Sequence, residues 1–255
     1  MDSLSPVGLG TMGIDDPATI ETAIDVGYRH LDTARVYGNE ATVGEGIARS
    51  DADREDLFVA TKLWIDDLAS DDALDAAAES LDRLGLDRVD LLYVHRPRGA
   101  YDPAETLPAL DEIRGRGWTA HVGVSNFEVP QVETARDHLD APIVANQVEY
   151  HPLFQPVDAL EDARDHDYHL VAYSPLANGR AGEIPEVVAI AEAHDLTPEV
   201  VCLAWLAAKE GVVPIPKASS ARHLRANLAA ADVGLDPADH DRLDGIAREE
   251  ELFPE

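Results

Sequence analysis

The chain has 255 residues, of which 45% are hydrophobic and 27% are charged, a composition typical of a globular protein with a large core. Its 50 acidic and 20 basic residues give a formal net charge of −30. Such a charge repels phosphate backbones and anionic lipid surfaces, which disfavours binding to nucleic acid or to a membrane. The sequence shows no apolar stretch near the roughly 20 residues that cross a bilayer, no secretory leader and a single cysteine, so we expect a cytoplasmic protein.

The acidic residues are spread along the whole chain, as in IDDLASDDALD and ARDHDYH, and are not gathered in a tail. Lysine is scarce, with only Lys62, Lys209 and Lys217. This combination resembles halophilic proteins, in which concentrated salt shortens the Debye length to roughly 3 Å and screens self-repulsion.

Apolar, β-rich runs alternate with amphipathic helical patterns, and no linker divides the chain. The predicted strands are Pro6–Leu9, His30–Asp32, Leu57–Leu63, Val89–His95, His121–Ser125, Ile143–Tyr150, Leu170–Ser174 and Val212–Pro216. Helical patterns include residues 17–27, 73–85, 104–117 and 130–140. Capping residues precede proline at Asp16, Asp102 and Thr197, and glycine ends helices at Gly27, Gly85 and Gly117.

Eight strands that alternate with helices predict an α/β protein with a parallel sheet. The length favours one domain, residues 1–255, folded as a closed (β/α)8 TIM barrel, with an open doubly wound sheet as the alternative. In such a barrel the chemistry lies at the carboxyl ends of the strands. The predicted ends carry polar groups: Asp32, Lys62, His95, Ser125, Gln147, Tyr173 and Lys217.

The stretch GLGTMG, Gly8 to Gly13, matches the dinucleotide fingerprint of Rossmann dehydrogenases, with Asp32 about 20 residues further on. Two features disfavour this alternative. The preceding strand is short and contains a proline, and Asp15 and Asp16 would repel a pyrophosphate at the start of the next helix.

The stretch GYRHLDTARVYGNE, which contains Asp32 and Tyr37, resembles the signature of the aldo-keto reductases. The likeness continues in the family's order through VATKLW, VDLLYVHRP, HVGVSNF, NQVEYHP, AYSPLA and VPIPKASS, from about Gly8 to Asn227. The family's fold is the (β/α)8 barrel. The resemblance implies an NAD(P)H-dependent oxidoreductase that reduces aldehydes and ketones to alcohols.

By motif, the family's catalytic tetrad falls on Asp32, Tyr37, Lys62 and His95. Carbonyl reduction needs a proton on oxygen, and a phenol with a pKa of about 10 is a weak acid at neutral pH. An ammonium beside the phenol stabilises phenolate, a carboxylate keeps that ammonium charged, and a histidine can orient the carbonyl. Each residue alone has an ordinary structural explanation, but four on successive strand ends favour the catalytic one.

The resemblance also implies a nicotinamide cofactor, NADP(H), bound in an extended pose. Ser125, Asn126 and Gln147 would hold its carboxamide, and Tyr173 would stack on its ring. The remaining implied contacts, which run towards the pyrophosphate and the adenosine phosphate, are Thr11, Asp32, Ser174, Leu176, Pro216, Lys217, Ala218, Ser219, Ser220, His223 and Asn227.

One segment departs from the family pattern. Counted from Lys217, the usual phosphate-binding arginine falls on His223, and Arg222 is displaced by one position, which turns it about 100° on a helix. A neutral histidine is a poorer phosphate partner than an arginine. We therefore expect a weakened preference for NADPH, with NAD(H) as a second cofactor.

On the substrate side, Met12, Trp64, His95 and Arg96 would line the pocket mouth. Arg96 stands where the family usually has tryptophan, an exchange that favours anionic or polyhydroxylated carbonyls, unless the side chain points to solvent. The segment after Asn227 is short, so we expect an open mouth and broad tolerance, as in microbial diketogluconate and small-aldehyde reductases.

The expected partner is thus a small-molecule carbonyl substrate, with no metal, and we expect a monomer. A second interpretation is a non-catalytic nicotinamide-binding subunit that senses redox state for a membrane partner. Such a role needs an apolar docking patch, and the acidic sequence shows no pattern typical of one.

The charge pattern predicts that the protein needs concentrated salt. Dialysis into dilute buffer should remove the screening of the −30 net charge and unfold or inactivate the protein. Circular dichroism and turnover, measured from molar to millimolar salt, test this. Full activity in dilute buffer would contradict it.

Overall fold

The computed structural model describes residues 4–254, and its strands form one parallel eight-stranded sheet in chain order. The strands are β1 (Leu9–Gly10), β2 (His30–Asp32), β3 (Phe58–Leu63), β4 (Val89–Val94), β5 (Thr119–Ser125), β6 (Ile143–Glu149), β7 (His169–Tyr173) and β8 (Val212–Pro214). Two backbone hydrogen bonds join the first strand region to the last, from Gly8 N to Pro214 O at 3.0 Å and from Gly10 N to Pro216 O at 3.3 Å. The predicted (β/α)8 barrel is therefore confirmed.

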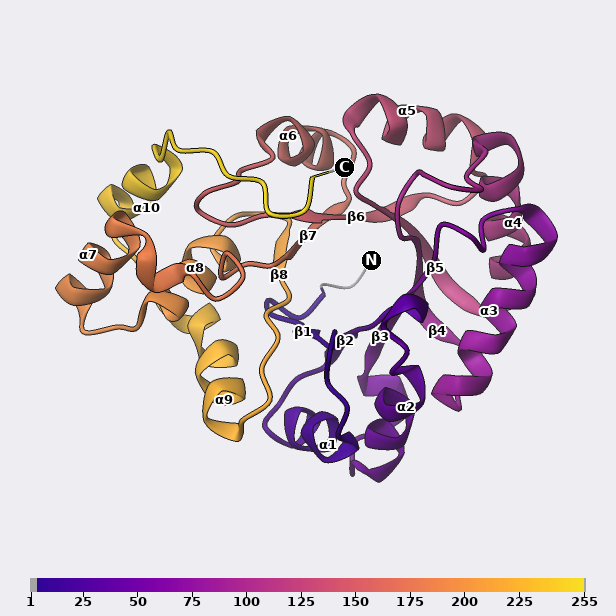
Figure 1. The fold of residues 1–255 in the computed structure, drawn as a ribbon, viewed down its shortest axis with the longest axis horizontal. Helices are drawn as coiled ribbons and strands as arrows, with labels where there is room; N and C mark the ends of the chain where they lie inside the picture. The colour runs from indigo at the N-terminus through magenta and orange to yellow at the C-terminus, as the bar shows by residue number, and fades with distance from the viewer. Residues whose placement is uncertain (1–3, 255) are drawn as a thin grey trace.

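The helices form a ring outside the strands (Figure 1). They are α1 (Pro17–Asp25), α2 (Glu40–Arg49), α3 (Ser70–Leu84), α4 (Pro103–Gly115), α5 (Val129–His138), α6 (Val157–Asp165), α7 (Pro185–His194), α8 (Pro198–Ala207), α9 (Ala221–Ala229) and α10 (Pro237–Asp244). The capping predictions hold. Asp16 accepts from Ala18 N at 3.0 Å, Asp102 accepts from Ala104 N at 2.9 Å, and Thr197 caps α8.

Several strand boundaries differ from the predicted ones. The first strand is shifted to Leu9–Gly10, and β7 stops at Tyr173 because Ser174 takes a left-handed φ of 50°. Two helices, α7 and α8, lie between β7 and β8 where a barrel unit needs only one.

The Rossmann alternative is wrong. The run Gly8–Gly13 leads from a two-residue strand into a turn, and α1 begins only at Pro17. Two of its glycines, Gly8 and Gly10, serve barrel closure. A Cβ at Gly10 would meet Ile215 O at 2.7 Å, too close for any side chain.

The alternation of side chains along β3 explains why a lysine follows an apolar run. Ala60 belongs to the cluster that fills the barrel interior, whereas Val59 and Leu63 pack in the layer beneath the helices. Because side chains two residues apart share a face of a strand, Lys62 points into the barrel with Ala60. The lysine therefore lies inside the barrel, near the carboxyl end of the strands.

Helices α2 and α3 pack so closely that one position of α2 must be glycine. A Cβ at Gly44 would lie 2.1 Å from Leu84 O. Gly115, at the end of α4, has no atom within 4 Å of the same position. The two glycines therefore form a matched pair, one crowded and one open.

Gly44→Ala should lower the free energy of unfolding by about 1–3 kcal/mol, because the helices must separate to admit the methyl group. Gly115→Ala should leave it unchanged or raise it by up to about 1 kcal/mol, since alanine loses less backbone entropy on folding. Denaturant titration in high salt measures both, and equal effects of the two changes would refute the steric argument.

Candidate functional site

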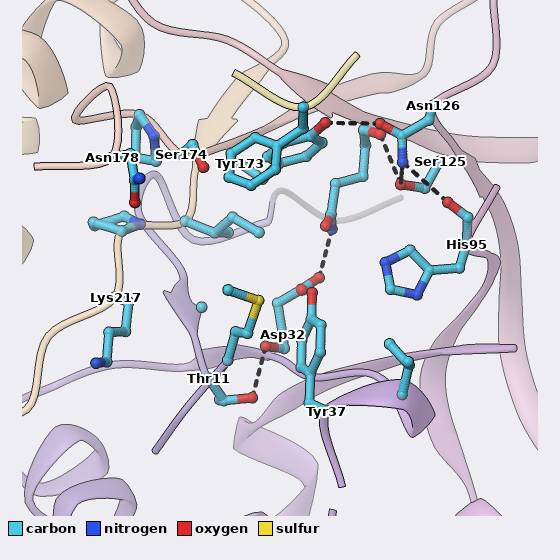
Figure 2. A pocket seen from close by; sticks show the side chains of 18 of the residues that line it. Thr11, Asp32, Tyr37, His95, Ser125, Asn126, Tyr173, Ser174, Asn178 and Lys217 are labelled. Atoms are coloured by element: carbon cyan, nitrogen blue, oxygen red, sulfur yellow. Dashed lines mark hydrogen bonds between the residues drawn. The ribbon is translucent and has the colours of Figure 1, made fainter. Parts of the chain in front are cut away.

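Consecutive strand ends bring the four predicted catalytic residues together, and Figure 2 shows three of them, Asp32, Tyr37 and His95. Asp32 ends β2, Lys62 lies in β3 and His95 directly follows β4. Tyr37 closes a short 3-10 turn, Arg35–Tyr37, between β2 and α2. All but Lys62 line one cavity of about 840 Å³, and Lys62 is buried beneath its floor.

Asp32 and Lys62 form a buried ion pair, with side-chain exposures of 2% and 0%. The ammonium also donates to Thr33 O at 2.8 Å, and the second oxygen of Asp32 accepts from Gln147 Nε2 at 2.6 Å. Desolvation alone would lower the pKa of Lys62, but the negative charge of Asp32 and the nearby Tyr37 outweigh it and leave the pKa raised. The lysine therefore stays charged within a low-dielectric interior.

Tyr37 lies directly above this pair, with Lys62 Nζ 5.3 Å from the ring centre. Burial raises the pKa of Tyr37, and the positive charges of Lys62 and Arg96 oppose that rise. The phenol consequently holds its proton at neutral pH, and the ammonium beside it stabilises any phenolate that forms.

His95 packs edge-on against both Tyr37 and Trp64, at ring-centre distances of 5.9 and 5.0 Å. Burial, followed by the charges of Lys62 and Arg96, lowers the pKa of His95 to about 2. The imidazole is therefore neutral and presents one N–H donor and one acceptor.

A chain of hydrogen bonds joins the opposite wall of the cavity to the ion pair. Tyr173 donates to Asn126 Oδ1 at 2.9 Å, and Asn126 donates to Ser125 Oγ at 3.1 Å and to His95 O at 3.0 Å. Ser125 in turn donates to Gln147 O at 2.8 Å. Asn126 adopts a left-handed φ of 59°, which turns its amide back to these partners. These bonds hold the polar side chains of Tyr173, Asn126 and Ser125 in fixed positions.

The comparisons with known proteins establish the family. The model of the Aldo/keto reductase family matches residues 6–248. The chain belongs to the aldo-keto reductase family. As an aldo-keto reductase, it is an oxidoreductase that acts on carbonyl and alcohol groups and uses a nicotinamide cofactor, as the sequence predicted.

Individual relatives cover almost the whole chain. It is 38% identical to methylglyoxal reductase DkgB of Salmonella typhi, over 92% of this chain and 90% of that protein. It is 37% identical to an aldo-keto reductase of Mycolicibacterium vanbaalenii, over 96% and 89%. A solved aldo-keto reductase from a Medee basin deep-sea metagenome library superposes with a TM-score of 0.94 at 31% identity, over 99% and 95%.

Most residues that the sequence assigned to cofactor and substrate line the same cavity of this aldo-keto reductase. They are Thr11, Met12, Asp32, Tyr37, Trp64, His95, Arg96, Ser125, Asn126, Gln147, Tyr173, Ser174, Leu176, Pro216 and Lys217. The others do not line it: Ala218, Ser219, Ser220, His223 and Asn227. Ser220 instead caps α9 by accepting from His223 N at 3.2 Å, and Asn227 is buried on that helix.

Two site residues carry no signal that a single sequence reveals. Asn39 is buried and donates to Thr11 O at 2.8 Å and Ile14 O at 3.0 Å, so it fixes the loop that follows β1. Phe253, in the C-terminal segment, lines the cavity and packs against Tyr173. The C-terminal segment therefore forms part of the cavity wall, which its shortness did not predict.

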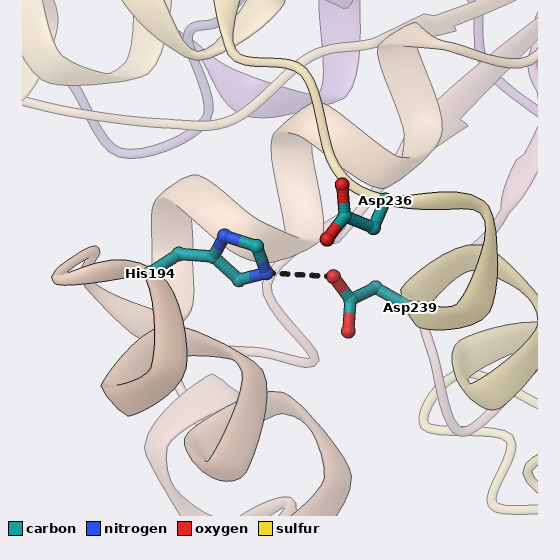
Figure 3. A group of neighbouring side chains, drawn as sticks. All are labelled: His194, Asp236 and Asp239. Carbon is teal, nitrogen blue, oxygen red and sulfur yellow. Dashed lines mark hydrogen bonds and ion pairs between the residues drawn. The ribbon is translucent and has the colours of Figure 1, made fainter.

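A separate cluster of one histidine and two aspartates lies between α7 and α10 (Figure 3). His194 Nε2 lies 2.7 Å from Asp239 Oδ2, and Asp236 is adjacent. The His194–Asp239 contact gives these residues a structural role, since it fastens α10 to α7.

Within residues 4–254, no helix is both long and apolar enough to cross a membrane.

The environment of His95 predicts that its ring stays neutral throughout the working pH range. Because its pKa is lowered to about 2, the ¹⁵N shifts of its ring should stay constant from pH 8 to about 4. An ordinary histidine takes up a proton within this range. The signals can be assigned with His95→Gln. An imidazolium signal from His95 at pH 6 would contradict the described environment.

Proposed function

We propose that the protein reduces aldehydes and ketones to alcohols with NADPH or NADH, and that Tyr37 is the proton donor. The observation that carries this proposal is the buried Asp32–Lys62 pair beneath the Tyr37 ring, at the floor of the cavity. A charged lysine in the interior is costly unless it is paired, and even a buried pair adds little stability, so its position beside a phenol supports a role in tuning that phenol.

The residues divide the work of carbonyl reduction. A nicotinamide cofactor, when bound, would supply the hydride for the carbonyl carbon. Tyr37 gives its proton to the carbonyl oxygen, and Lys62 stabilises the resulting phenolate while Asp32 holds the ammonium in place. Neutral His95 donates a hydrogen bond that orients the carbonyl. The phenolate regains a proton from solvent before the next turnover.

The cavity suits an extended dinucleotide. Tyr173 forms an aromatic wall of the cavity and is hydrogen-bonded to the Asn126 amide. Lys217, an exposed residue, also lines the cavity. We propose that Ser125, Asn126 and Gln147 hold the carboxamide and that Tyr173 stacks on the ring. Gln147 would then share its amide with Asp32.

The remaining proposed contacts continue along the same ligand. They are Thr11, Asp32, Ser174, Leu176, Pro216, Lys217, Ala218, Ser219, Ser220, His223 and Asn227. Met12, Trp64 and Arg96 would face the carbonyl substrate, and relatives named methylglyoxal reductases make small aldehydes and dicarbonyls the first compounds to assay.

The surface around Lys217 predicts a modest preference between the two cofactors. Arg222 and His223 are exposed in the first turn of α9, and histidine stands at the position of the usual arginine. The ratio of kcat/KM for NADPH over NADH should stay below about 10³, equivalent to 4 kcal/mol. A larger ratio would show that Lys217 and its neighbours bind the 2′-phosphate fully.

Tyr37→Phe should lower kcat/KM by about 10² or more, because it removes the proton donor without changing the ring. Cofactor binding, followed by quenching of protein fluorescence, should be unchanged. Cofactor oxidation at high salt with a panel of aldehydes and ketones measures the effect. Tight cofactor binding with no turnover of any carbonyl by the unaltered protein would instead support the redox sensor.

A further inference from the structure

The C-terminal segment of residues 249–253, which we call the C-terminal strap, crosses the barrel mouth beside β6 and β7. In Figure 1 it is the yellow trace that runs from α10 towards α6 and β6. Its only predicted property was shortness, yet it makes several polar contacts with residues about 70 to 100 positions earlier in the chain.

Glu149, the last residue of β6, is the inner anchor of the strap. Its carboxylate is buried, and it accepts from Leu252 N at 2.7 Å and from Phe253 N at 3.0 Å. His151 Nε2 lies 2.7 Å from the same carboxylate. A buried carboxylate needs such partners to offset its desolvation, and here two of them are backbone groups of the strap.

Arg180 is the outer anchor. Its guanidinium forms a two-point ion pair with Glu250, one contact of which measures 3.0 Å. Glu250 N also donates to Leu153 O at 2.8 Å. Because a bidentate pair fixes direction as well as distance, it joins the strap firmly to the segment that contains Arg180.

That segment is the loop after β7, residues 174–180, much of which faces the cavity. The loop residues that line the cavity are Ser174, Pro175, Leu176, Asn178 and Gly179. At the other end of the strap, the Phe253 ring packs against Tyr173 at 5.8 Å and 72° and also lines the cavity. In the sheet register Glu149 is directly opposite Tyr173, so the inner anchor and the aromatic wall are neighbours.

We propose that Glu149 and Glu250 are positioning residues for cofactor binding, which act through the strap to hold the loop after β7 and the Phe253–Tyr173 wall against the bound dinucleotide. This inference rests on the proposed nicotinamide site. A dinucleotide that extends from Tyr173 towards Lys217 passes this loop, so its release requires the loop to move. The Arg180–Glu250 pair and the contacts of the strap with Glu149 oppose that movement.

The dissociation rate of NADPH tests the proposal without any carbonyl substrate. Stopped-flow fluorescence would follow the displacement of bound NADPH by excess NADP⁺. Glu250→Gln should raise the rate constant about threefold, the scale expected for one exposed ion pair. Glu149→Gln, which loses a buried, charged acceptor of two part-buried N–H groups, should raise it about tenfold.

Each variant has a matched control in the chain. Glu183→Gln removes the other carboxylate of Arg180, 3.2 Å from its Nε, without touching the strap. Asp162, on α6, is a buried carboxylate that binds Arg136 and Tyr168. Asp162→Asn therefore shows what a general loss of stability, away from the strap, does to the release rate. Both controls should release NADPH at the rate of the unaltered protein.

Faster release in the two strap variants, with unchanged controls, would support the proposal. Release at the unaltered rate in both Glu250→Gln and Glu149→Gln would overturn it while leaving the proposed reductase function in place. Equal acceleration in Glu149→Gln and Asp162→Asn, with no effect of Glu250→Gln, would also overturn it. Failure of the unaltered protein to bind NADPH or NADH would overturn both proposals.

Discussion

The site depends on one ion pair inside the barrel, between Lys62 and Asp32. An isolated ammonium in such an interior would lose its proton, because desolvation disfavours the charged form. Asp32, Thr33 O and the proximity of Tyr37 reverse that tendency. The barrel makes this arrangement possible, since alternate residues of adjacent strands point to the same interior and their carboxyl ends lie at one mouth.

The rest of the site can be understood as support for this pair. Gln147 binds the free oxygen of Asp32, and the Tyr173–Asn126–Ser125 chain reaches Gln147 from the far wall. Ser125 binds the backbone carbonyl of Gln147, while the side-chain amide of Gln147 binds Asp32, so both parts of this residue are held in place. Such preorganisation keeps the electrostatic environment of Tyr37 constant during a reaction.

Much of this was predictable because it follows from local patterns. Asp32, Lys62 and His95 stand at strand ends that apolar periodicity locates, and Asp16 and Asp102 mark helix starts by their caps. The motif order in the chain then assigned the candidate site residues and the family, and the comparisons confirmed the family. The cofactor and substrate roles of individual residues remain proposals.

The features that could not be predicted depend on distance along the chain. In the sequence, Glu149 is one of several polar residues near the end of a strand. Only the folded chain shows that it binds backbone groups about 100 residues later. Asn39 looks like a turn residue, yet it is buried against the loop after β1. The contribution of Phe253 to the cavity wall could not be predicted either, because it depends on where α10 ends and which way the chain then runs.

Lys62→Arg tests the central claim most directly, because it keeps the positive charge and changes only its shape. A planar guanidinium cannot place a compact charge between Asp32 and the Tyr37 phenol. The account predicts a folded protein that binds cofactor and whose kcat/KM for an aldehyde is lower by a factor of about 10² or more. A variant that folds, binds cofactor and retains the activity of the unaltered protein would contradict it.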